Sequence, residues 1–377
     1  EEMDELMLFW ESLEGNQALF VLLAVFFLWH VVRMAYRCSL LRAGKRQPVK
    51  RKEEGVSVII TCSNRAELLR QNLEAFLRQN YPRFEVIVVD ECSEDETQEV
   101  LLKFQKKYPH LKVSRIPSAT KFRCTKKIAI NIGILAAKYD MLLFSEIYCR
   151  PSGMGWIRAM QAAFDSRTAV VLGFANYEDK KGAGTKRYFR FLRFWRMVDL
   201  VHAGMYVMGN GCNMGYRKSY YLEERGFSGN TQAYIGFDTE MVKKLSKRGK
   251  VKVVKEHEAH MVIMDDSKKA WGDDLSYFYA TRSKWPARAV WWASMDFVVE
   301  MLLYLLIFYF IVQNPYRLYF SWLVVFVCVY NLIIINLGQK RLHQMKLFLP
   351  SLRSTTCGFI QKWYHNLCSI FTSRKWK

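Results

Sequence analysis

Three apolar runs constrain the fold of this chain more than any other feature of its sequence. Residues 18–36, 297–312 and 318–337 are almost entirely apolar. The first and third have about the 20 residues that an α-helix needs to cross a bilayer, and the second is slightly shorter. The short polar stretch at residues 313–317 suits the turn of a hairpin. We therefore expect a transmembrane helix at residues 18–36 and a transmembrane helical hairpin at residues 297–337.

The charged residues beside these runs predict an orientation. The linker at residues 37–54 carries seven Lys and Arg residues before its first acid, and the tail at residues 338–377 carries eight and no acid. Cytoplasmic flanks of membrane spans are enriched in such residues. We expect residues 1–17, which are acidic, to be external. The predicted location is the bacterial cytoplasmic (inner) membrane, with a multi-pass topology and a cytoplasmic central domain.

Other interpretations of these segments stay open. The first run lacks a basic start, so we expect a retained anchor and not a cleaved signal peptide. The sequence does not begin with Met, so residues are expected to precede it. Asp296 and Glu300 are costly in hydrocarbon, which leaves an interfacial hairpin as the alternative. Residues 286–296 are predicted to form an interfacial helix. Residues 187–196 mix cations with aromatics, and fit either an interfacial or a protein-packed helix.

Composition limits the classes of partner. Of the 377 residues 51% are apolar, which is ample for a core, and the formal net charge is +21. That charge is concentrated beside the apolar runs and no nucleic-acid module is evident, so we expect membrane lipid as a partner and no nucleic acid. The nine cysteines include no CxxC pair, which predicts reduced thiols. His257 and His260 are interpreted as ordinary histidines.

The central region at residues 55–285 is predicted to be an α/β domain with a mainly parallel sheet. Short apolar runs alternate there with helical periodicity. Strands are expected at residues 56–61, 84–89, 111–116 and 141–144, and helices at residues 67–79, 97–108 and 126–137. Ligands bind beyond the carboxyl ends of such strands. Because GxGxxG and GxxxxGK[ST] are absent, the usual dinucleotide and P-loop sites are excluded.

Two of the predicted strand ends resemble the family 2 glycosyltransferases of the GT-A fold. Residues 57–64 are similar to that family's first strand and loop, and residues 90–97 (DECSEDET) are similar to its Asp-Asp-x-Ser-x-Asp-x-Thr motif. By this resemblance Asp90 hydrogen-bonds the base of a nucleotide-sugar donor, as an acceptor-only carboxylate can. The donor-binding residues implied in this way are Thr61, Ser63, Asn64, Asp90, Ser93, Asp95, Lys126, Lys127, Asn131, Glu146 and Asn213.

Three later segments extend the resemblance. Residues 126–134 are similar to the family's Lys-Ala-x-Asn-x-Gly helix, whose start would face the diphosphate. Residues 209–219 resemble the segment behind the donor sugar, and residues 236–240 match the position of the Glu-Asp acceptor motif. The resemblance implies that Asp238 is the catalytic base. The alternative for Asp238 is a helix N-cap.

The sequence also departs from the family pattern. Glu146-Ile147-Tyr148 stands where the family has Asp-x-Asp, so one metal-binding carboxylate is lost. Glu146 is then the predicted metal ligand, for a weakly bound divalent cation such as Mg²⁺ or Mn²⁺. Phe237 replaces the Glu of Glu-Asp. The family's Gln-x-x-Arg-Trp box is represented only by three predicted acceptor and diphosphate residues, Arg282, Lys284 and Trp285.

The activity that the resemblance implies is that of an inverting glycosyltransferase at the cytoplasmic membrane face. It would move a sugar from a nucleotide-sugar donor to a lipid-linked or surface-glycan acceptor, for example in cell-envelope polysaccharide synthesis. The altered motifs leave an alternative, a catalytically degenerate pseudo-glycosyltransferase that binds a nucleotide, a glycolipid or a partner protein. A thiolate cluster is conceivable, because Cys62, Cys92, Cys149 and Cys212 fall near the predicted site loops, but small buried side chains are the simpler interpretation.

Overall fold

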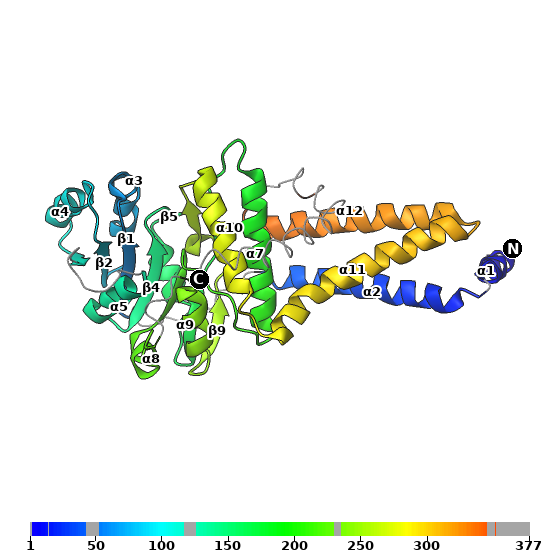
Figure 1. Ribbon diagram of the computed structural model, residues 1–377, viewed down its shortest axis with the longest axis horizontal. Helices are drawn as coiled ribbons and strands as arrows, with labels where there is room; N and C mark the ends of the chain where they lie inside the picture. The colour runs from blue at the N-terminus through cyan, green and yellow to red at the C-terminus, as the bar shows by residue number, and fades with distance from the viewer. Residues whose placement is uncertain are drawn as a thin grey trace. The chain divides into compact units, whose positions relative to one another are not determined.

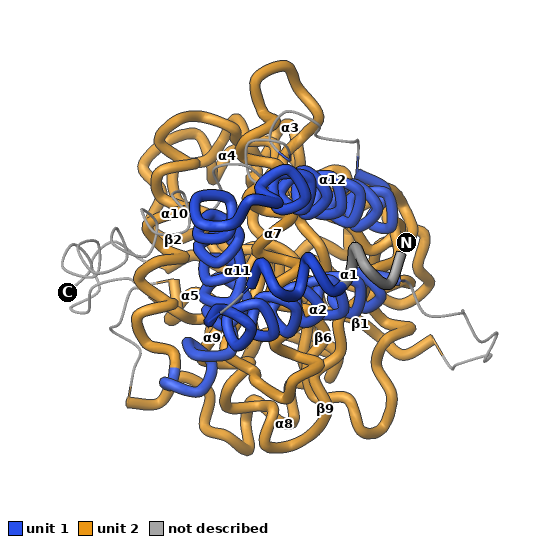
Figure 2. The backbone as a smooth tube through the Cα atoms, turned by 90° about the vertical axis from the view of Figure 1, so that its right-hand side faces the viewer, with its two compact units in different colours: residues 1–42, 286–368 blue, residues 43–285, 369–377 orange. Residues whose placement is uncertain are grey.

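The computed structural model describes residues 2–13, 15–42, 53–116, 126–229, 235–344 and 351. The chain forms two compact units, shown in different colours in Figure 2. We call residues 1–42 with 286–368 the helical unit, and residues 43–285 with 369–377 the α/β unit. The most basic part of the predicted linker and nearly all of the predicted tail lie outside the described residues.

The described part of the helical unit consists of three long apolar helices and one shorter helix. Its described elements are α1 (Glu2–Glu11), α2 (Gln17–Ser39), α11 (Ala287–Gln313) and α12 (Arg317–Arg341). Among the described residues, α2, α11 and α12 are long and apolar enough to cross a membrane, with 23, 27 and 25 residues. The stretch at residues 286–296 is continuous with the second span, because α11 runs without a break from Ala287.

Polar side chains of the helical unit pair with one another. Asp296 on α11 accepts hydrogen bonds from Arg33 at 3.0 Å and from Arg37 at 2.9 Å, both on α2. The ring of His30 lies 2.8 Å from the side-chain oxygen of Asn331 on α12, and both side chains are buried. Ionisable groups at membrane depth need such partners. Pairing therefore explains how an apolar helix can carry Asp296.

The α/β unit is built on a seven-stranded sheet with the order β3-β2-β1-β4-β8-β6-β9. Its strands are β1 (Val56–Cys62), β2 (Phe84–Glu91), β3 (Leu111–Ile116), β4 (Met141–Glu146), β6 (Thr168–Leu172), β8 (Met214–Arg217) and β9 (Lys250–Val253). The pairs among β1 to β4 are parallel, while β8 is antiparallel to both β4 and β6. A smaller sheet has the order β5-β10-β7, formed by β5 (Cys149–Pro151), β10 (Met261–Ile263) and β7 (Ala175–Tyr177).

Helices complete the α/β unit (Figure 1). They are α3 (Ala66–Leu77), α4 (Thr97–Lys107), α5 (Lys126–Ala136), α6 (Trp156–Gln161), α7 (Gly184–His202), α8 (Lys218–Glu223), α9 (Phe237–Leu245), α10 (Lys268–Arg282) and the short 3₁₀ helix η1 (His257–Ala259). The strands and helices predicted between residues 56 and 144 are all present, so the predicted α/β class with a mainly parallel sheet is confirmed. Their apolar faces form the core of the unit.

Helix α5 packs very closely on the sheet. A Cβ atom at Gly133 would lie 2.7 Å from a methyl carbon of Ile59 on β1. Only glycine permits this approach without a shift of the sheet or the helix. The close packing holds Lys126, the first residue of α5, near the carboxyl ends of the central strands.

The stretch at residues 187–196 belongs to α7 and is packed inside the protein. Tyr188, Phe191 and Trp195 are buried there, each 3% exposed or less. Arg187 on this helix is buried as well and pairs with Asp179. For this stretch the structure therefore supports the packed alternative, and it is not an exposed interfacial helix.

Candidate functional site

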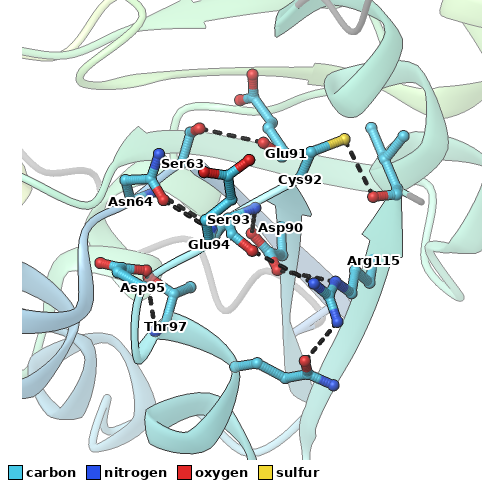
Figure 3. Close-up of polar contacts among 12 residues, drawn as sticks. Ser63, Asn64, Asp90, Glu91, Cys92, Ser93, Glu94, Asp95, Thr97 and Arg115 are labelled. Carbon is cyan, nitrogen blue, oxygen red and sulfur yellow. Dashed lines mark hydrogen bonds and ion pairs between the residues drawn. The ribbon is translucent and has the colours of Figure 1, made fainter. Parts of the chain in front are cut away.

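Asp90 lies at the carboxyl end of β2, where parallel strands present their ligand-binding edge. It pairs in register with Cys62, the last residue of β1. Its side chain is 1% exposed, and one carboxylate oxygen, Oδ1, accepts a hydrogen bond from the backbone N–H of Ser93 at 3.1 Å (Figure 3). The local backbone therefore fixes the direction of this carboxylate.

The second carboxylate oxygen of Asp90 has spare hydrogen-bonding capacity. Oδ2 is buried and accepts no hydrogen bond from the residues that the structure describes. The Nε atom of Arg115 is 3.7 Å away, which allows an ion pair but is too long for a hydrogen bond. A buried acceptor without a donor is costly. This atom is thus suited to accept an N–H from a ligand, as a nucleobase imide would supply.

Asn64 and Ser93 fasten the loop after β1 to the loop after β2. The backbone N–H of Asn64 donates to the Ser93 hydroxyl at 2.8 Å, and the Asn64 side-chain oxygen accepts from the backbone N–H of Glu94 at 2.8 Å. Ser63 adds a hydrogen bond from its hydroxyl to the backbone carbonyl of Glu91 at 3.1 Å (Figure 3). These polar groups are used to hold the two loops together.

Asp95 joins the N-termini of two helices. Its carboxylate accepts from the backbone N–H of Ala66, the first residue of α3, at 3.1 Å and from that of Thr97, the first residue of α4, at 3.0 Å. Acids at helix N-termini satisfy otherwise unpaired N–H groups and complement the helix dipole. Several members of the motif therefore build the loop, whereas Asp90 keeps a buried oxygen that accepts no hydrogen bond from the described residues.

A cavity of about 300 Å³ lies in the α/β unit at the end of β4. Three residues that the sequence analysis singled out for the donor or the reaction line it, namely Lys126, Glu146 and Asp238. Residues from α7 and α10, which the sequence analysis did not assign to a site, line it as well. The cavity therefore combines residues from distant parts of the chain.

Glu146 and Lys126 form an ion pair on one wall of this cavity. Glu146 is the last residue of β4, is 6% exposed, and lies in register with Thr61 of β1, whose side chain is also buried. The Lys126 ammonium donates a hydrogen bond to Glu146 Oε1. Burial raises the pKa of Glu146 to about 7, although the charge of Lys126 opposes that rise. The carboxylate thus has a cationic partner supplied by the protein.

The next cavity residue in the altered motif is Tyr148. Its hydroxyl lies 3.6 Å from the sulfur of Cys212, and burial raises the pKa of the phenol well above its ordinary value. A hydrogen bond from Cys149, which is also buried, lowers the pKa of the Cys212 thiol. Two of the four cysteines near the predicted loops are therefore in contact, as buried free thiols.

This donor set does not fit a hard divalent cation. Mg²⁺ and Mn²⁺ bind oxygen ligands, chiefly carboxylates, whereas Tyr148 is a neutral phenol. The carboxylate of Glu146 is already paired with an ammonium. No group of three or more His, Cys, Asp or Glu side chains that could hold a metal occurs within the described ranges.

Asp238, the predicted catalytic base, lines the cavity from the first turn of α9. Tyr277 donates to its Oδ1 at 2.5 Å, and the backbone N–H of Gly211 donates to its Oδ2 at 3.2 Å. A Cβ at Gly209 would lie 2.6 Å from the backbone carbonyl carbon of Asp238, so a glycine is required for this approach. The N-cap of α9 is Gly236, not Asp238. The carboxylate is therefore buried, oriented and turned to the cavity.

Two arginines and an aspartate form a second charged group on the cavity wall. Asp274 on α10 binds Arg190 and Arg193 on α7, each at 2.9 Å. Burial alone would raise the pKa of Asp274, but the two guanidinium groups hold it below its ordinary value. Neither this group nor Tyr277 was predicted from the sequence. The available signal was the spacing of Arg187, Arg190, Arg193 and Arg196 by three residues, which is typical of one helix face.

Of the predicted donor-binding residues, only Lys126 and Glu146 line the cavity. Thr61 and the loop residues around Asp90 lie outside the lining, and so do three residues from other elements. Lys127 is buried in an ion pair with Glu240 at 2.8 Å, and Asn131 accepts a hydrogen bond from the Tyr221 hydroxyl at 2.8 Å. Asn213 is fully buried and bonds two backbone carbonyls at 2.8 and 2.7 Å and an indole N–H at 3.0 Å. These side chains support the walls of the unit, and their roles toward a donor stay predictions.

The predicted acceptor and diphosphate residues cluster at the end of α10. Arg282 is its last residue, Lys284 is exposed and Trp285 is buried. None of the three is among the residues that line the cavity. The part of α10 that reaches the cavity lies earlier in the helix, at Asp274 and Tyr277.

Comparison with known proteins gives the class of this domain. Residues 57–224 match the profile described as Glycosyl transferase family 2. A solved structure, the mannosyltransferase PcManGT from Pyrobaculum calidifontis in complex with GDP-Man and Mn2+, aligns over 90% of this chain and 97% of its own with a TM-score of 0.54 and 15% sequence identity. The chain thus carries a family 2 glycosyltransferase domain with the GT-A fold. The predicted family and fold are confirmed.

Sequence relatives come from several kinds of organism. Ceramide glucosyltransferase 1 of Caenorhabditis elegans is 25% identical over 251 residues, which are 63% of this chain and 52% of that protein. Poly-beta-1,6-N-acetyl-D-glucosamine synthase of Staphylococcus epidermidis is 31% identical over 109 residues, which are 28% of this chain and 23% of that protein. The chain therefore spans about half the length, or less, of these curated relatives.

Proposed function

We propose that this protein is an inverting glycosyltransferase that moves a sugar from a nucleotide-sugar donor to a membrane-associated acceptor. The observation that carries the proposal is the placement of Asp238, a buried and oriented carboxylate, on a cavity that also holds the cation Lys126. A base and a cation on one cavity are what a transfer from a nucleoside diphosphate requires. The domain family and the solved neighbour, which holds GDP-Man, support a nucleotide-sugar donor.

The donor base is assigned to Asp90. Its unused Oδ2 would accept an N–H from the base, a charge-assisted hydrogen bond that fixes the nucleotide at the edge of the sheet. Ser63, Asn64, Ser93 and Asp95 would act through the shape of the loop. The diphosphate would extend from this edge toward Lys126.

The reaction is assigned to Asp238. Its carboxylate would take the proton of an acceptor hydroxyl while the acceptor oxygen forms a bond to the anomeric carbon of the donor sugar. The bond from that carbon to the diphosphate oxygen breaks, and the electron pair leaves with the nucleoside diphosphate. A single displacement of this kind inverts the anomeric centre and needs one base. Lys126 would stabilise the negative charge on the leaving group.

The solved neighbour also contains Mn2+, which makes a divalent cation a candidate for the same task. A weakly bound cation at Glu146 was predicted from the sequence. Because Glu146 is paired with Lys126, we assign the stabilisation of the leaving group to the lysine.

The acceptor is proposed from the membrane-capable helices and from the relatives. One relative is named for ceramide and another for a poly-N-acetylglucosamine polymer, so both lipid-linked and glycan acceptors fit. Helices α2, α11 and α12 would hold the enzyme at a membrane where such acceptors are found. We propose a multi-pass protein of a bacterial cytoplasmic membrane with the α/β unit on the cytoplasmic side, because the basic flanks favour that orientation.

The activity can be tested with the full chain purified in detergent or lipid nanodiscs. We expect hydrolysis or transfer with at least one donor from a panel of UDP- and GDP-sugars, measured by release of the nucleoside diphosphate. Binding of a nucleotide with no turnover of any donor, in the presence of membrane lipid extracts, would contradict the proposal and favour the pseudo-glycosyltransferase. Labelling of single cysteines from outside intact cells would test the orientation. Strong labelling near residue 46 would overturn it.

A further inference from the structure

We propose that the diphosphate site of this protein works without a divalent cation, because the ammonium group of Lys126 fills that role next to Glu146. The inference rests on the proposed function, since it concerns how the donor's diphosphate is held. It predicts that nucleotide binding is insensitive to chelators, and it names one lysine as the reason.

The position of Lys126 is fixed by two contacts besides the helix that carries it. The ammonium donates to Glu146 Oε1, and it lies 5.0 Å from the ring centroid of Phe237, within range of a cation–π interaction. The Lys126 side chain is 30% exposed, so one side of it reaches the cavity. A buried carboxylate and an aromatic face therefore hold a positive charge on the cavity wall.

A metal ion would find few ligands on this wall. A divalent cation at Glu146 would have to displace the ammonium or approach it closely, and the two like charges would repel each other. Tyr148 and Cys212, which lie beside Glu146 in the cavity lining, offer a phenol and a thiol in place of carboxylates. Mg²⁺ and Mn²⁺ bind both groups poorly.

Four other described carboxylates line the cavity: three of them, Asp238, Asp265 and Asp274, have hydrogen-bond or ion-pair partners, and the fourth, Asp273, is exposed on α10. Asp238 receives hydrogen bonds from Tyr277 and from a backbone N–H, and Asp274 is held by two arginines. Asp265 accepts the backbone N–H of Ser267 at 3.1 Å at the approach to α10. Glu91, the last residue of β2, is a further carboxylate near Glu146; it is hydrogen-bonded to Thr61 and lies close enough to Lys126 for the ammonium to oppose the rise in its pKa that burial causes. The one ammonium therefore serves both carboxylates, and a metal ion at either of them would have to compete with it.

Lys126 also has a suitable place in the fold for an anion. It is the first residue of α5, an 11-residue helix whose N-terminal end carries the positive end of the helix dipole. The ammonium and the helix end would act on the same phosphate groups. Together they supply a positive charge that is permanently attached to the protein, whereas a metal site must be filled before it can act.

The test measures the binding of UDP and GDP to the full chain by calorimetry, with excess chelator or with Mn²⁺. Native affinity for whichever nucleotide binds should change by less than about 2-fold between the two conditions. Lys126→Met should weaken binding by about 10-fold or more, because a charge-assisted contact is lost. Lys126→Arg, which keeps the charge, should stay within a few-fold of native.

A double variant makes the inference sharper. Lys126→Met combined with Tyr148→Asp removes the ammonium and supplies a second carboxylate beside Glu146. Its nucleotide binding should become dependent on Mn²⁺, with an enhancement of about 10-fold or more. Lys103→Met, which removes an exposed lysine of α4, is the matched control and should leave binding unchanged under both conditions. Thermal unfolding of each variant checks that the fold is retained.

The outcomes separate this inference from the proposed function. Native binding that is lost in chelator and restored by Mn²⁺ would overturn the inference and leave the proposed transfer intact. Unchanged binding in a folded Lys126→Met protein would overturn it as well. Chelator-insensitive binding without turnover of any donor would contradict the transferase and support the inference. Absence of UDP and GDP binding in the native protein would count against both.

Discussion

The two ends of the candidate site differ in how much of the family motif they keep and in what the motif side chains bind. At the Asp90 end the motif is nearly intact, and most of its polar side chains bond backbone groups of the same two loops. At the Glu146 end the motif is altered, and its remaining carboxylate binds a lysine from another segment. The Asp90 motif therefore builds a local structure from its own members. The altered Glu146 motif has instead gained a partner, Lys126, from another segment of the chain.

The carboxylates of Asp90 and Asp238 differ in the same way, and the difference suggests separate roles in binding and in reaction. Asp90 keeps one oxygen without a hydrogen-bond donor among the described residues, which suits a ligand. Asp238 has donors on both oxygens and still faces the cavity. We expect the first residue to govern affinity and the second to govern turnover. Substitutions at these two residues and at their partners test this division.

Asp238→Asn should lower kcat by roughly 10²-fold or more, because an amide cannot take the acceptor proton. The affinity for the nucleoside diphosphate should change little, since this residue is assigned to the acceptor side. Steady-state kinetics and calorimetry on the same preparation measure the two quantities. Equal losses in kcat and in nucleotide affinity would show that Asp238 is part of the donor site. Asp238 and Asp90 would then not differ in role.

Asp90→Asn should weaken nucleotide binding by about 10- to 100-fold, which corresponds to the loss of a hydrogen bond to a charged group. The rate at saturating donor should remain close to native. Asp95→Asn is a useful comparison, because Asp95 bonds helix N-termini. Its main effect should be on the free energy of unfolding, measured by denaturant titration. A pure kcat defect in Asp90→Asn would contradict the assignment.

Tyr277→Phe should lower kcat by about 10-fold at neutral pH, because Asp238 loses a donor that orients its carboxylate. Nucleotide affinity should stay unchanged, because Tyr277 is expected to act through Asp238. Steady-state kinetics and calorimetry measure the two quantities, and a matching loss of nucleotide affinity would assign Tyr277 to the packing of the cavity.

Glu146→Gln should remove a pH dependence of nucleotide binding. In the native protein the affinity should fall by about 2- to 5-fold between pH 6 and pH 8. The pKa of Glu146 is raised to about 7 by burial, so the carboxyl group is neutral below that pH and charged above it. Once charged, it competes with the diphosphate for Lys126. Native affinity should thus fall as the pH rises from 6 to 8, and the variant should lack this fall. Ionisation of the nucleotide itself affects both proteins equally.

Much of the fold could be predicted from the sequence. The apolar runs are long and continuous, and the order of strands and helices from residue 56 to 144 follows from short apolar runs and helical periodicity. These signals are local, because burial of one strand or one helix face depends on residues close in sequence. The position of Asp90 at a strand end was predictable for the same reason.

The partners of the site residues were decided only by the tertiary structure. Lys126 meets Glu146 across 20 residues, and Asp238 meets Tyr277 across 39. No sequence pattern indicated that Asn213 and Lys127 would bind other groups inside the protein. Nor did a pattern indicate that Arg190 and Asp274 would line the cavity. Each sequence signal reports which residues are apolar or charged along one segment. Which charges neutralise each other depends on how the segments pack, and that packing decides whether Glu146 has a lysine or a metal ion beside it.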